Sequence, residues 1–465
     1  MLRPLFRMVA TWLVVSVGLA IPSDAATRSS LTRALRSAPA HKSGCCTDVE
    51  TILYHFQWDP KTESAPYGAG PLAGVTLDPS GNGVIYGTTV HGGAYKHGVI
   101  FKLTPSGPGY EESVIFSFPK SIDWSLASAP VLVDTTGAIY STTGANVAND
   151  CGTVFKLTPT GSTYAASTIH SFRKSSDGCD PALAGLYEDP SGALYGTTIG
   201  GGDSSCSNEP GQQNGCGTVF KLTPTGSGAY SESFVYRFVG GRDGKEPISG
   251  LIADSSGALY GTTGGGGELK CNCGVVYKLT PTGSGPYAMT VIHDFGVDAS
   301  PGPLTADAAG DLYGTAIARR GGGNVVYELT PSASASTGYT YRLIYNASDG
   351  RPGEVILCSS GGALCAAAFF AGPVDAGDVF ELNPPQDPSA TYGETTLYTF
   401  EGGDTGANPS SYIVYSGGAI YGTFWANGGP SGSQNHRFEP FGGVFKIALP
   451  SSSSFLNGAE FGATS

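Results

Sequence analysis

One short segment occurs seven times along the chain, and this repetition constrains the fold more than any other feature. The segment reads Gly-Ala-Leu-Tyr-Gly-Thr-Thr at 192–198 and again at 257–263. Its seven copies centre on Tyr86, Tyr140, Tyr195, Tyr260, Tyr313, Cys365 and Tyr421. A second segment, Gly-Thr-Val-Phe-Lys-Leu-Thr-Pro at 152–159 and 217–224, follows each copy in similar form. Such internal repetition predicts one supersecondary unit that packs against copies of itself.

The sequence of each repeat unit predicts four short strands. An apolar stretch such as 72–77 leads into an Asp-x-x-Gly turn, in which Asp bonds the backbone ahead of it and Gly accepts a positive φ. The Leu-Tyr-Gly-Thr-Thr and Val-Phe-Lys-Leu segments give the second and third strands, and a stretch such as 114–118 gives the fourth. The chain contains 70 Gly and 31 Pro, and no helix-length segment separates the strands. An α/β fold is therefore excluded.

The two ends of the repeat array indicate a closed ring. The last unit stops after its third strand, at 445–447, whereas residues 51–56 near the N-terminus match the fourth strand at 397–400. An N-terminal strand that completes the last sheet removes the exposed ends that an open stack would have to cap. We therefore predict an all-β, seven-bladed β-propeller of four-stranded blades over residues 50–449, closed by this N-terminal strand.

The N-terminal residues resemble an export signal. Arg3 and Arg7 precede an apolar run over 8–21, and small residues follow at Ser23 and Ala25. A membrane anchor is the alternative, but the run is shorter than the ~20 apolar residues of a membrane span. We expect a signal peptide at 1–25, a linker at 26–49 and a flexible Ser-rich tail at 450–465. The mature chain is expected to be a monomer without a membrane span, secreted, periplasmic or on the cell surface.

Export makes the ten cysteines informative, because disulfides persist in oxidising compartments. Cys206 and Cys216 lie in one long loop, and Cys358 and Cys365 lie on successive predicted strands, so both pairs are expected to form bridges. Other pairings to consider are Cys151 with Cys179, and Cys271 or Cys273 with Cys45 or Cys46. A zinc site is not expected, since Cys271-Asn272-Cys273 has the wrong spacing and no nearby His.

The paired segments resemble those of the GloVer tandem-repeat family of exported bacterial proteins, over roughly residues 50–449. The resemblance implies export, and it often comes with a C-terminal anchoring tail. Residues 451–465 depart from that pattern, since they have no apolar span and no terminal basic cluster. The resemblance implies no defined activity.

Candidate binding residues gather on one predicted face. The loops between second and third strands vary in length, from the compact 90–97 to the long 199–216 and 425–441, and they share a face with the connections between blades. Each connection carries an Asp, which either forms a turn or belongs to an acidic rim for cations or sugar hydroxyls. Trp residues on this face either stack on sugar rings or pack as caps. The candidates are Asp59, Asp123, Asp177, Asp243, Asp298, Asp349, Asp404, Trp58, Trp124 and Trp425.

The remaining patterns indicate which function classes to expect. A net charge of −13 disfavours nucleic acid as a partner. His170 and His293 occupy an aromatic slot of the fourth strand, where packing is the expected role, and no Gly-x-Ser-x-Gly elbow is present. We predict a non-catalytic binding or interaction propeller for carbohydrate or protein, without a cofactor unless Ca²⁺ binds. The alternatives are an extracellular glycan hydrolase or lyase with its site at the variable loops, and a structural protein of the cell envelope.

Overall fold

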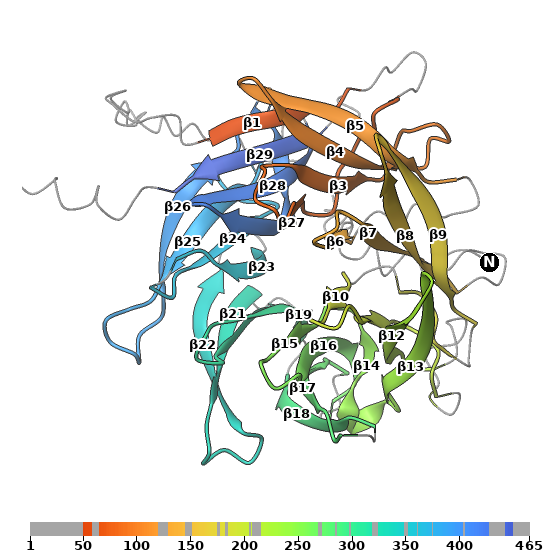
Figure 1. Ribbon diagram of the computed structural model, residues 1–465. Coiled ribbons are helices and arrows are strands. Elements are labelled where there is room, and N and C mark those ends of the chain that lie inside the picture. The colour runs from red at the N-terminus through yellow and green to blue at the C-terminus, as the bar shows by residue number, and fades with distance from the viewer. Residues whose placement is uncertain are drawn as a thin grey trace, which may run out of the picture.

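The computed structural model describes residues 50–57, 65–119, 129–144, 151–173, 177–181, 185–203, 206, 215–267, 272–283, 286–296, 299–318, 324–347, 352–359, 361–373, 375–402, 405–426 and 442–449. Within these ranges the strands form seven antiparallel sheets around a common axis (Figure 1). The protein is a seven-bladed β-propeller of four-stranded blades, which confirms the prediction from the repeats. In blade 4 the innermost position is divided between two short strands.

In blades 1 to 6 the strands run outward from the axis in chain order, and in blade 7 the outermost strand is β1, the first strand of the chain. Blade 1 contains β2 (Thr76–Leu77), β3 (Ile85–Thr89), β4 (Val99–Ser106) and β5 (Gly109–Ser117). Blade 2 contains β6 (Leu132–Val133), β7 (Ile139–Thr143), β8 (Thr153–Thr160) and β9 (Thr163–Ser171). Blade 3 contains β10 (Tyr187–Glu188), β11 (Leu194–Thr198), β12 (Thr218–Gly226) and β13 (Ala229–Arg237). Blade 4 contains β14 (Lys245–Pro247), β15 (Ile252–Ala253), β16 (Leu259–Gly265), β17 (Val275–Thr280) and β18 (Ala288–Asp294). Blade 5 contains β19 (Ala299–Ala306), β20 (Leu312–Ala318), β21 (Asn324–Pro331) and β22 (Tyr339–Ala347). Blade 6 contains β23 (Pro352–Leu357), β24 (Leu364–Ala368), β25 (Asp378–Asn383) and β26 (Gly393–Thr399). Blade 7 contains β27 (Ala407–Ser416), β28 (Ala419–Ala426), β29 (Gly443–Ala448) and β1 (Glu50–His55). A 3-10 turn, η2 (Gly241–Asp243), lies between blades 3 and 4.

The first strand of the chain closes the ring. β1 pairs antiparallel with β29, with Thr51 opposite Lys446 and His55 opposite Gly443. It forms the outer edge of blade 7, whose strand order is β1-β29-β28-β27. Figure 1 shows β1 beside β29, although the two come from opposite ends of the propeller sequence. The predicted closure is confirmed.

The apolar core lies between the blades. The described residues contain seven hydrophobic clusters, one at each contact between neighbouring blades. In β12, Phe220 and Leu222 join the cluster shared with blade 2, whereas Val219 joins the cluster shared with blade 4. Alternate residues of one strand thus reach the two neighbouring blades, because successive side chains point to opposite faces of a sheet. Both faces of each blade are buried.

The Gly of the Leu-Tyr-Gly-Thr-Thr segment makes room for an aromatic ring of the third strand. A Cβ added at Gly196 would lie 2.5 Å from Cζ of Phe220, and one added at Gly87 would lie equally close to Phe101. Gly261 approaches the hydroxyl of Tyr277 in the same way. Any side chain at these positions would overlap a fully buried ring.

The two Thr residues of the segment have different partners. The first crosses to the next blade: Thr197 donates to the carbonyl of Ser249 at 3.3 Å, and Thr262 donates to that of Gly302 at 3.0 Å. The second stays in its own blade, where Thr198 donates to the carbonyl of Gly200 at 2.9 Å. One Thr therefore fixes the innermost strand of the neighbouring blade, and the other fixes the loop that follows.

The Tyr of the segment belongs to a polar contact on the face of the short turns, which we name the tyrosine clasp. In blade 4, the Tyr260 hydroxyl donates to Asp254 at 2.8 Å, and Lys278 Nζ lies 5.0 Å from the Tyr260 ring centroid and 3.6 Å from Asp254. Tyr339 of blade 5 donates to the Tyr260 hydroxyl at 3.2 Å, so the clasp joins two blades. The same Tyr-to-Asp bond is made by Tyr86, Tyr140, Tyr195 and Tyr313.

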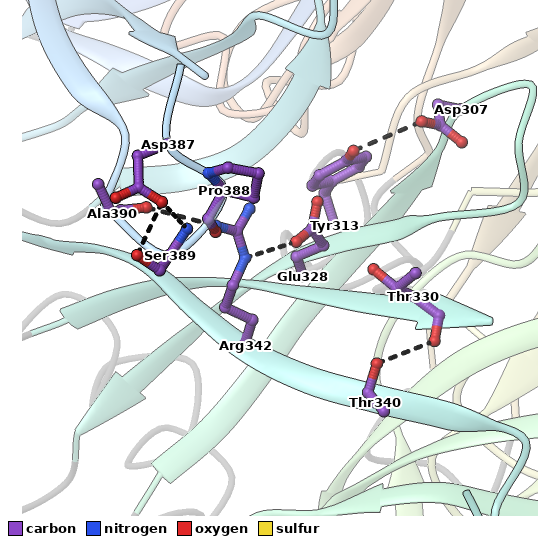
Figure 2. A network of polar contacts seen from close by, with 10 residues as sticks. All are labelled: Asp307, Tyr313, Glu328, Thr330, Thr340, Arg342, Asp387, Pro388, Ser389 and Ala390. Atoms are coloured by element: carbon purple, nitrogen blue, oxygen red, sulfur yellow. Dashed lines mark hydrogen bonds and ion pairs between the residues drawn. The ribbon is translucent and has the colours of Figure 1, made fainter. Parts of the chain in front are cut away.

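Blade 5 has an altered clasp (Figure 2). Glu328 stands where blades 1 to 4 and blade 7 have Lys, and it accepts a hydrogen bond at 2.8 Å from Nε of Arg342 on the fourth strand. Arg342 also donates to the carbonyls of Pro388 and Ala390, which lie between β25 and β26 of blade 6. The contact to the next blade is preserved with different charges.

Blade 6 replaces the whole clasp. Cys358, Cys365 and Glu381 occupy the positions of Asp, Tyr and Lys, and the two Cys form a disulfide. The expected Cys206–Cys216 bridge is also present, as is the Cys151–Cys179 pairing. Cys273 is disulfide-bonded. Cys45 and Cys46 lie outside the described residues, so the suggested pairing with either of them stays a prediction. In the part of the chain that the structure describes, no helix is long and apolar enough to cross a membrane.

Candidate functional site

Two of the predicted rim aspartates are described, and both form turns. Asp243 is 9% exposed and accepts hydrogen bonds from the Tyr236 hydroxyl at 2.8 Å and the Val239 amide at 3.1 Å. Asp177 is 5% exposed; it accepts from the Arg173 amide and lies 3.7 Å from His170 Nε2. These contacts correspond to the turn interpretation. The other predicted aspartates lie outside the described residues, and a ligand role for them stays a prediction: Asp59, Asp123, Asp298, Asp349 and Asp404.

Of the three candidate tryptophans, Trp425 is described, and Trp58 and Trp124 lie outside the described residues. Trp425 is near the end of β28, half-buried, at the contact between blades 7 and 1. Its ring lies 3.1 Å from where a Cβ would stand on Gly70, and 6.3 Å from the ring of His91 between centroids. It packs as a cap, and part of its surface remains accessible.

Two exposed tyrosines lie on the loops beside this Trp–His pair. Tyr67 is 49% exposed on the connection into blade 1, and Tyr95 is 56% exposed on the β3–β4 loop. Backbone hydrogen bonds hold the two loops together, because His91 and Ala69 exchange N–H···O bonds of 2.9 and 3.0 Å. We call Tyr67, His91, Tyr95 and Trp425 the aromatic rim.

Polar groups accompany the aromatic rim. Lys96 and His97 follow Tyr95 in the same loop, and Lys96 is exposed with a φ of 63°. Burial lowers the pKa of His91, so this imidazole is neutral at pH 7 and carries one hydrogen-bond donor and one acceptor. The rim therefore combines exposed ring faces with a cation and neutral hydrogen-bonding groups.

A second group of residues surrounds the propeller axis, where Figure 1 shows the innermost strands of the blades facing one another. Each blade contributes one residue to this group. It is the residue four positions before the first residue of the turn that joins the first and second strands of the blade. We call this set the axial ring: Gly74, Pro130, Gly185, Gly250, Pro303, Glu354 and Tyr412. Neighbouring members are close, since a Cβ on Gly74 would lie 2.6 Å from the Tyr412 carbonyl oxygen.

Glu354 is the one ionisable carboxyl group of the axial ring. Protein atoms surround it, yet it keeps some solvent-accessible surface, as expected at the axis of a ring. Burial raises its pKa to about 7, and it interacts electrostatically with Tyr412. Our sequence reasoning missed Glu354; the signal was a charged residue at a position where the other units have Gly, Pro or Tyr. It also missed Tyr67 and Tyr95, whose exposure depends on how the loops pack.

The histidines in the fourth-strand aromatic slot are packed. His170 makes an edge contact with Phe172 at 4.6 Å, and His293 stacks on Tyr341 with centroids 4.1 Å apart. Burial lowers the pKa of both imidazoles. Donor atoms of Cys358, Cys365 and Glu381 lie within 4.8 Å of one another, but the disulfide occupies both sulfurs. We therefore assign no metal to that cluster.

Comparison with known sequences identifies the family of the chain. The model of the Gloeobacter/Verrucomicrobia repeat matches residues 43–209 and 205–435. The chain belongs to the Gloeobacter/Verrucomicrobia repeat family. This confirms the resemblance found in the repeat segments. No curated protein matches the chain significantly.

Solved structures similar to this Gloeobacter/Verrucomicrobia repeat chain are distant. A protein of unknown function from Dyadobacter fermentans DSM 18053 is 11% identical with a TM-score of 0.46, covering 86% of this chain and 100% of that one. A PL25 polysaccharide lyase, described as an ulvan lyase, is 11% identical with a TM-score of 0.49, covering 77% and 92%. A putative gluconolactonase is 13% identical with a TM-score of 0.37, covering 75% and 94%. None of these likenesses carries an activity over to this chain.

Proposed function

We propose that this propeller is an exported, non-catalytic carbohydrate-binding protein whose ligand stacks on the aromatic rim. The exposure of Tyr67 and Tyr95 on two loops held together by backbone bonds carries the proposal. Apolar surface that is exposed and rigid is a common property of binding sites, and aromatic rings present a flat face with a polar edge. Sugar rings offer the complementary apolar face and hydroxyl groups.

The polar groups at the rim support a glycan over a wholly apolar ligand. Neutral His91 and the Lys96 ammonium lie next to the exposed rings, where they can bond hydroxyl or acidic groups. Of the two described carboxylates of the predicted acidic rim, Asp177 accepts a hydrogen bond from the Arg173 amide, and Asp243 accepts hydrogen bonds through one of its two oxygens. This favours binding over hydrolysis.

A glycan array followed by calorimetry on the mature chain tests the proposal. Tyr67→Ala and Tyr95→Ala should each cost roughly 1 kcal/mol of binding, about fivefold in affinity. Tyr415→Ala is a matched control, because Tyr415 is 40% exposed and lies on β27, beside the short turns. Array silence, or equal binding by all variants, contradicts the proposal. Release of cleaved sugar by the wild-type chain would show an enzyme instead.

A further inference from the structure

We propose that β9, the outer strand of blade 2, pairs antiparallel with β9 of a second copy of this chain, so that two propellers share one continuous sheet. The paired edge is separate from the aromatic rim, and the inference does not depend on the proposed glycan. It replaces the monomer that we expected from the sequence. Figure 1 shows β9 at the outer edge of its blade, and in the described part of the chain β9 pairs with β8 alone.

The edge of β9 that faces away from β8 has backbone groups available for a further strand. Pro159 of β8, which has no N–H, lies opposite Tyr164, so this pair exchanges no hydrogen bonds. Such pairs alternate with hydrogen-bonded ones, and the register is regular as far as Thr168. Ala166 and Thr168 therefore have the same phase as Tyr164. All three residues direct their N–H and C=O groups away from β8.

Of the seven outer strands that the structure describes, β9 is the one without a charged residue. It reads Thr-Tyr-Ala-Ala-Ser-Thr-Ile-His-Ser, whereas each of the others contains Asp, Glu or Arg. Burial lowers the pKa of His170, so its imidazole is neutral at pH 7. At the register position of Ala166, four other blades have a glutamate: Glu50, Glu112, Glu232 and Glu394. Charged residues on an edge strand oppose pairing with another chain, and blade 2 lacks this protection.

The middle of β9 is open on both faces. Residues 165–168 are all exposed, and successive side chains of a strand point to opposite faces, so neither face is covered there. Their side chains are Ala, Ala, Ser and Thr, which are too short to shield the backbone edge. In blade 6, residues 393–396 of β26 are exposed to the same extent, but Glu394 lies among them. Exposure combined with the absence of charge is what distinguishes β9.

The charge of the chain and the symmetry of the strand favour a second copy as the partner. Because the net charge is −13, two copies repel one another, and an uncharged edge is where they can approach. A two-fold axis at Ala166 places this residue opposite itself and Tyr164 opposite Thr168 of the second copy. Every outward N–H and C=O of the three residues then has a partner, as an isologous contact requires.

Sedimentation velocity of the intact mature chain tests the pairing. A contact of this size is at the lower end of interface areas, so we expect a monomer–dimer equilibrium with a Kd on the order of 10 µM. Ala166→Glu should weaken the dimer roughly tenfold or more, because it places two carboxylates directly opposite each other. Thr395→Glu is the matched control, since it adds the same charge to the exposed stretch of β26. It should leave the Kd within about twofold of the wild-type value.

A cysteine at the two-fold axis tests the register. Directly opposite, hydrogen-bonded residues have Cα atoms about 5.5 Å apart, a separation that a disulfide spans. Ala166→Cys should therefore form a covalent dimer on oxidation, visible on a non-reducing gel, whereas Thr395→Cys should stay monomeric. The wild-type chain is the blank for its native cysteines.

A thermal melt shows whether each variant folds, and the Ala166→Cys cross-link keeps the test valid if Ala166→Glu does not fold. A wild-type chain that stays monomeric up to about 200 µM, well above the expected Kd, would overturn the proposal. Equal association by Ala166→Glu, or no covalent dimer from Ala166→Cys, would overturn it as well. Lost glycan binding by a chain that still dimerises would affect the proposed function alone.

Discussion

In blades 4 and 6, different residues hold the first turn of the blade against its second strand. In blade 4, Asp254, Tyr260 and Lys278 form a polar clasp with Tyr339 of the next blade. In blade 6, the same three positions are Cys358, Cys365 and Glu381, and a disulfide joins the first turn to the second strand. Both blades are antiparallel sheets whose strands follow one another in chain order.

The difference shows that blade geometry does not depend on the clasp itself. What both blades share is a fixed contact between the start of the first turn and the second strand. Blade 6 also carries Ala366-Ala367-Ala368 in place of Gly-Thr-Thr, so it lacks the Thr bonds that blade 4 sends to blade 5. A covalent bond within the blade accompanies the loss of polar bonds between blades.

The largest effect should come from giving blade 3 a side chain at the position where blade 6 accepts one. Gly196→Val places methyl groups where a Cβ is already 2.5 Å from the Phe220 ring, and overpacking of this kind should cost about 3 kcal/mol of unfolding free energy. Urea unfolding followed by circular dichroism measures it. Gly109→Ala is the control, since nothing lies within 4 Å of a Cβ there. Unfolding of Gly196→Val at the wild-type urea concentration would contradict the steric role of Gly.

Removing the blade 6 disulfide should have the next largest effect. Cys358→Ala with Cys365→Ala opens a loop with a sequence separation of 7, which should cost about 2–3 kcal/mol. A triple variant that combines Cys358→Asp, Cys365→Tyr and Glu381→Lys rebuilds the clasp of the other blades and should recover about 1 kcal/mol of this loss. Urea unfolding of the three chains measures both changes. If the triple variant is less stable than the double Ala variant, the two contacts are not interchangeable.

The smallest effect should be a pH dependence that only the polar clasp shows. Desolvation acts to raise the pKa of Asp254, but hydrogen bonds from Ser256, Tyr260 and Ala258 outweigh it and lower the pKa overall. The clasp therefore stabilises the fold above the unfolded-state pKa, near 3.8, and loses this contribution as the pH falls through the lower folded pKa.

Asp254→Asn should thus cost about 1 kcal/mol at pH 7 and less near pH 3. The cost of opening the Cys358–Cys365 bridge should be the same at both pH values, because a disulfide does not titrate. Urea unfolding at the two pH values measures both costs. A pH-independent cost of Asp254→Asn would indicate that its carboxylate charge contributes nothing to the clasp.

Much of the fold could be predicted because the same strand pattern occurs in seven repeat units. The repeat segments indicated the strands, and the incomplete last unit together with residues 51–56 indicated the ring closure. The roles of Gly196 and Thr197 could not be read in advance, since the ring and the carbonyl that they meet belong to other strands. Strand identity is local, whereas these contacts exist only after the blades pack.

The candidate sites were harder to predict for the same reason. Asp177 and Asp243 looked like a rim, but their partners are the preceding strand end, so their carboxylates face inward. Tyr67 and Tyr95 lie in loops without a repeated pattern. Glu354 becomes conspicuous only when the first strands of the seven blades are aligned, and four of these strands are two residues long.

The pairing of β1 with β29 also determines when the molecule can be finished. Glu50 is among the first propeller residues to be synthesised, and its partner Ile447 is among the last of them. Blade 7 therefore stays without its outer strand pairing until the whole propeller sequence has been made, and a propeller truncated before β29 cannot form this ring. Contacts of such long sequence separation also form slowly. Because β29 is the last strand in the sequence, the ring stays open throughout synthesis.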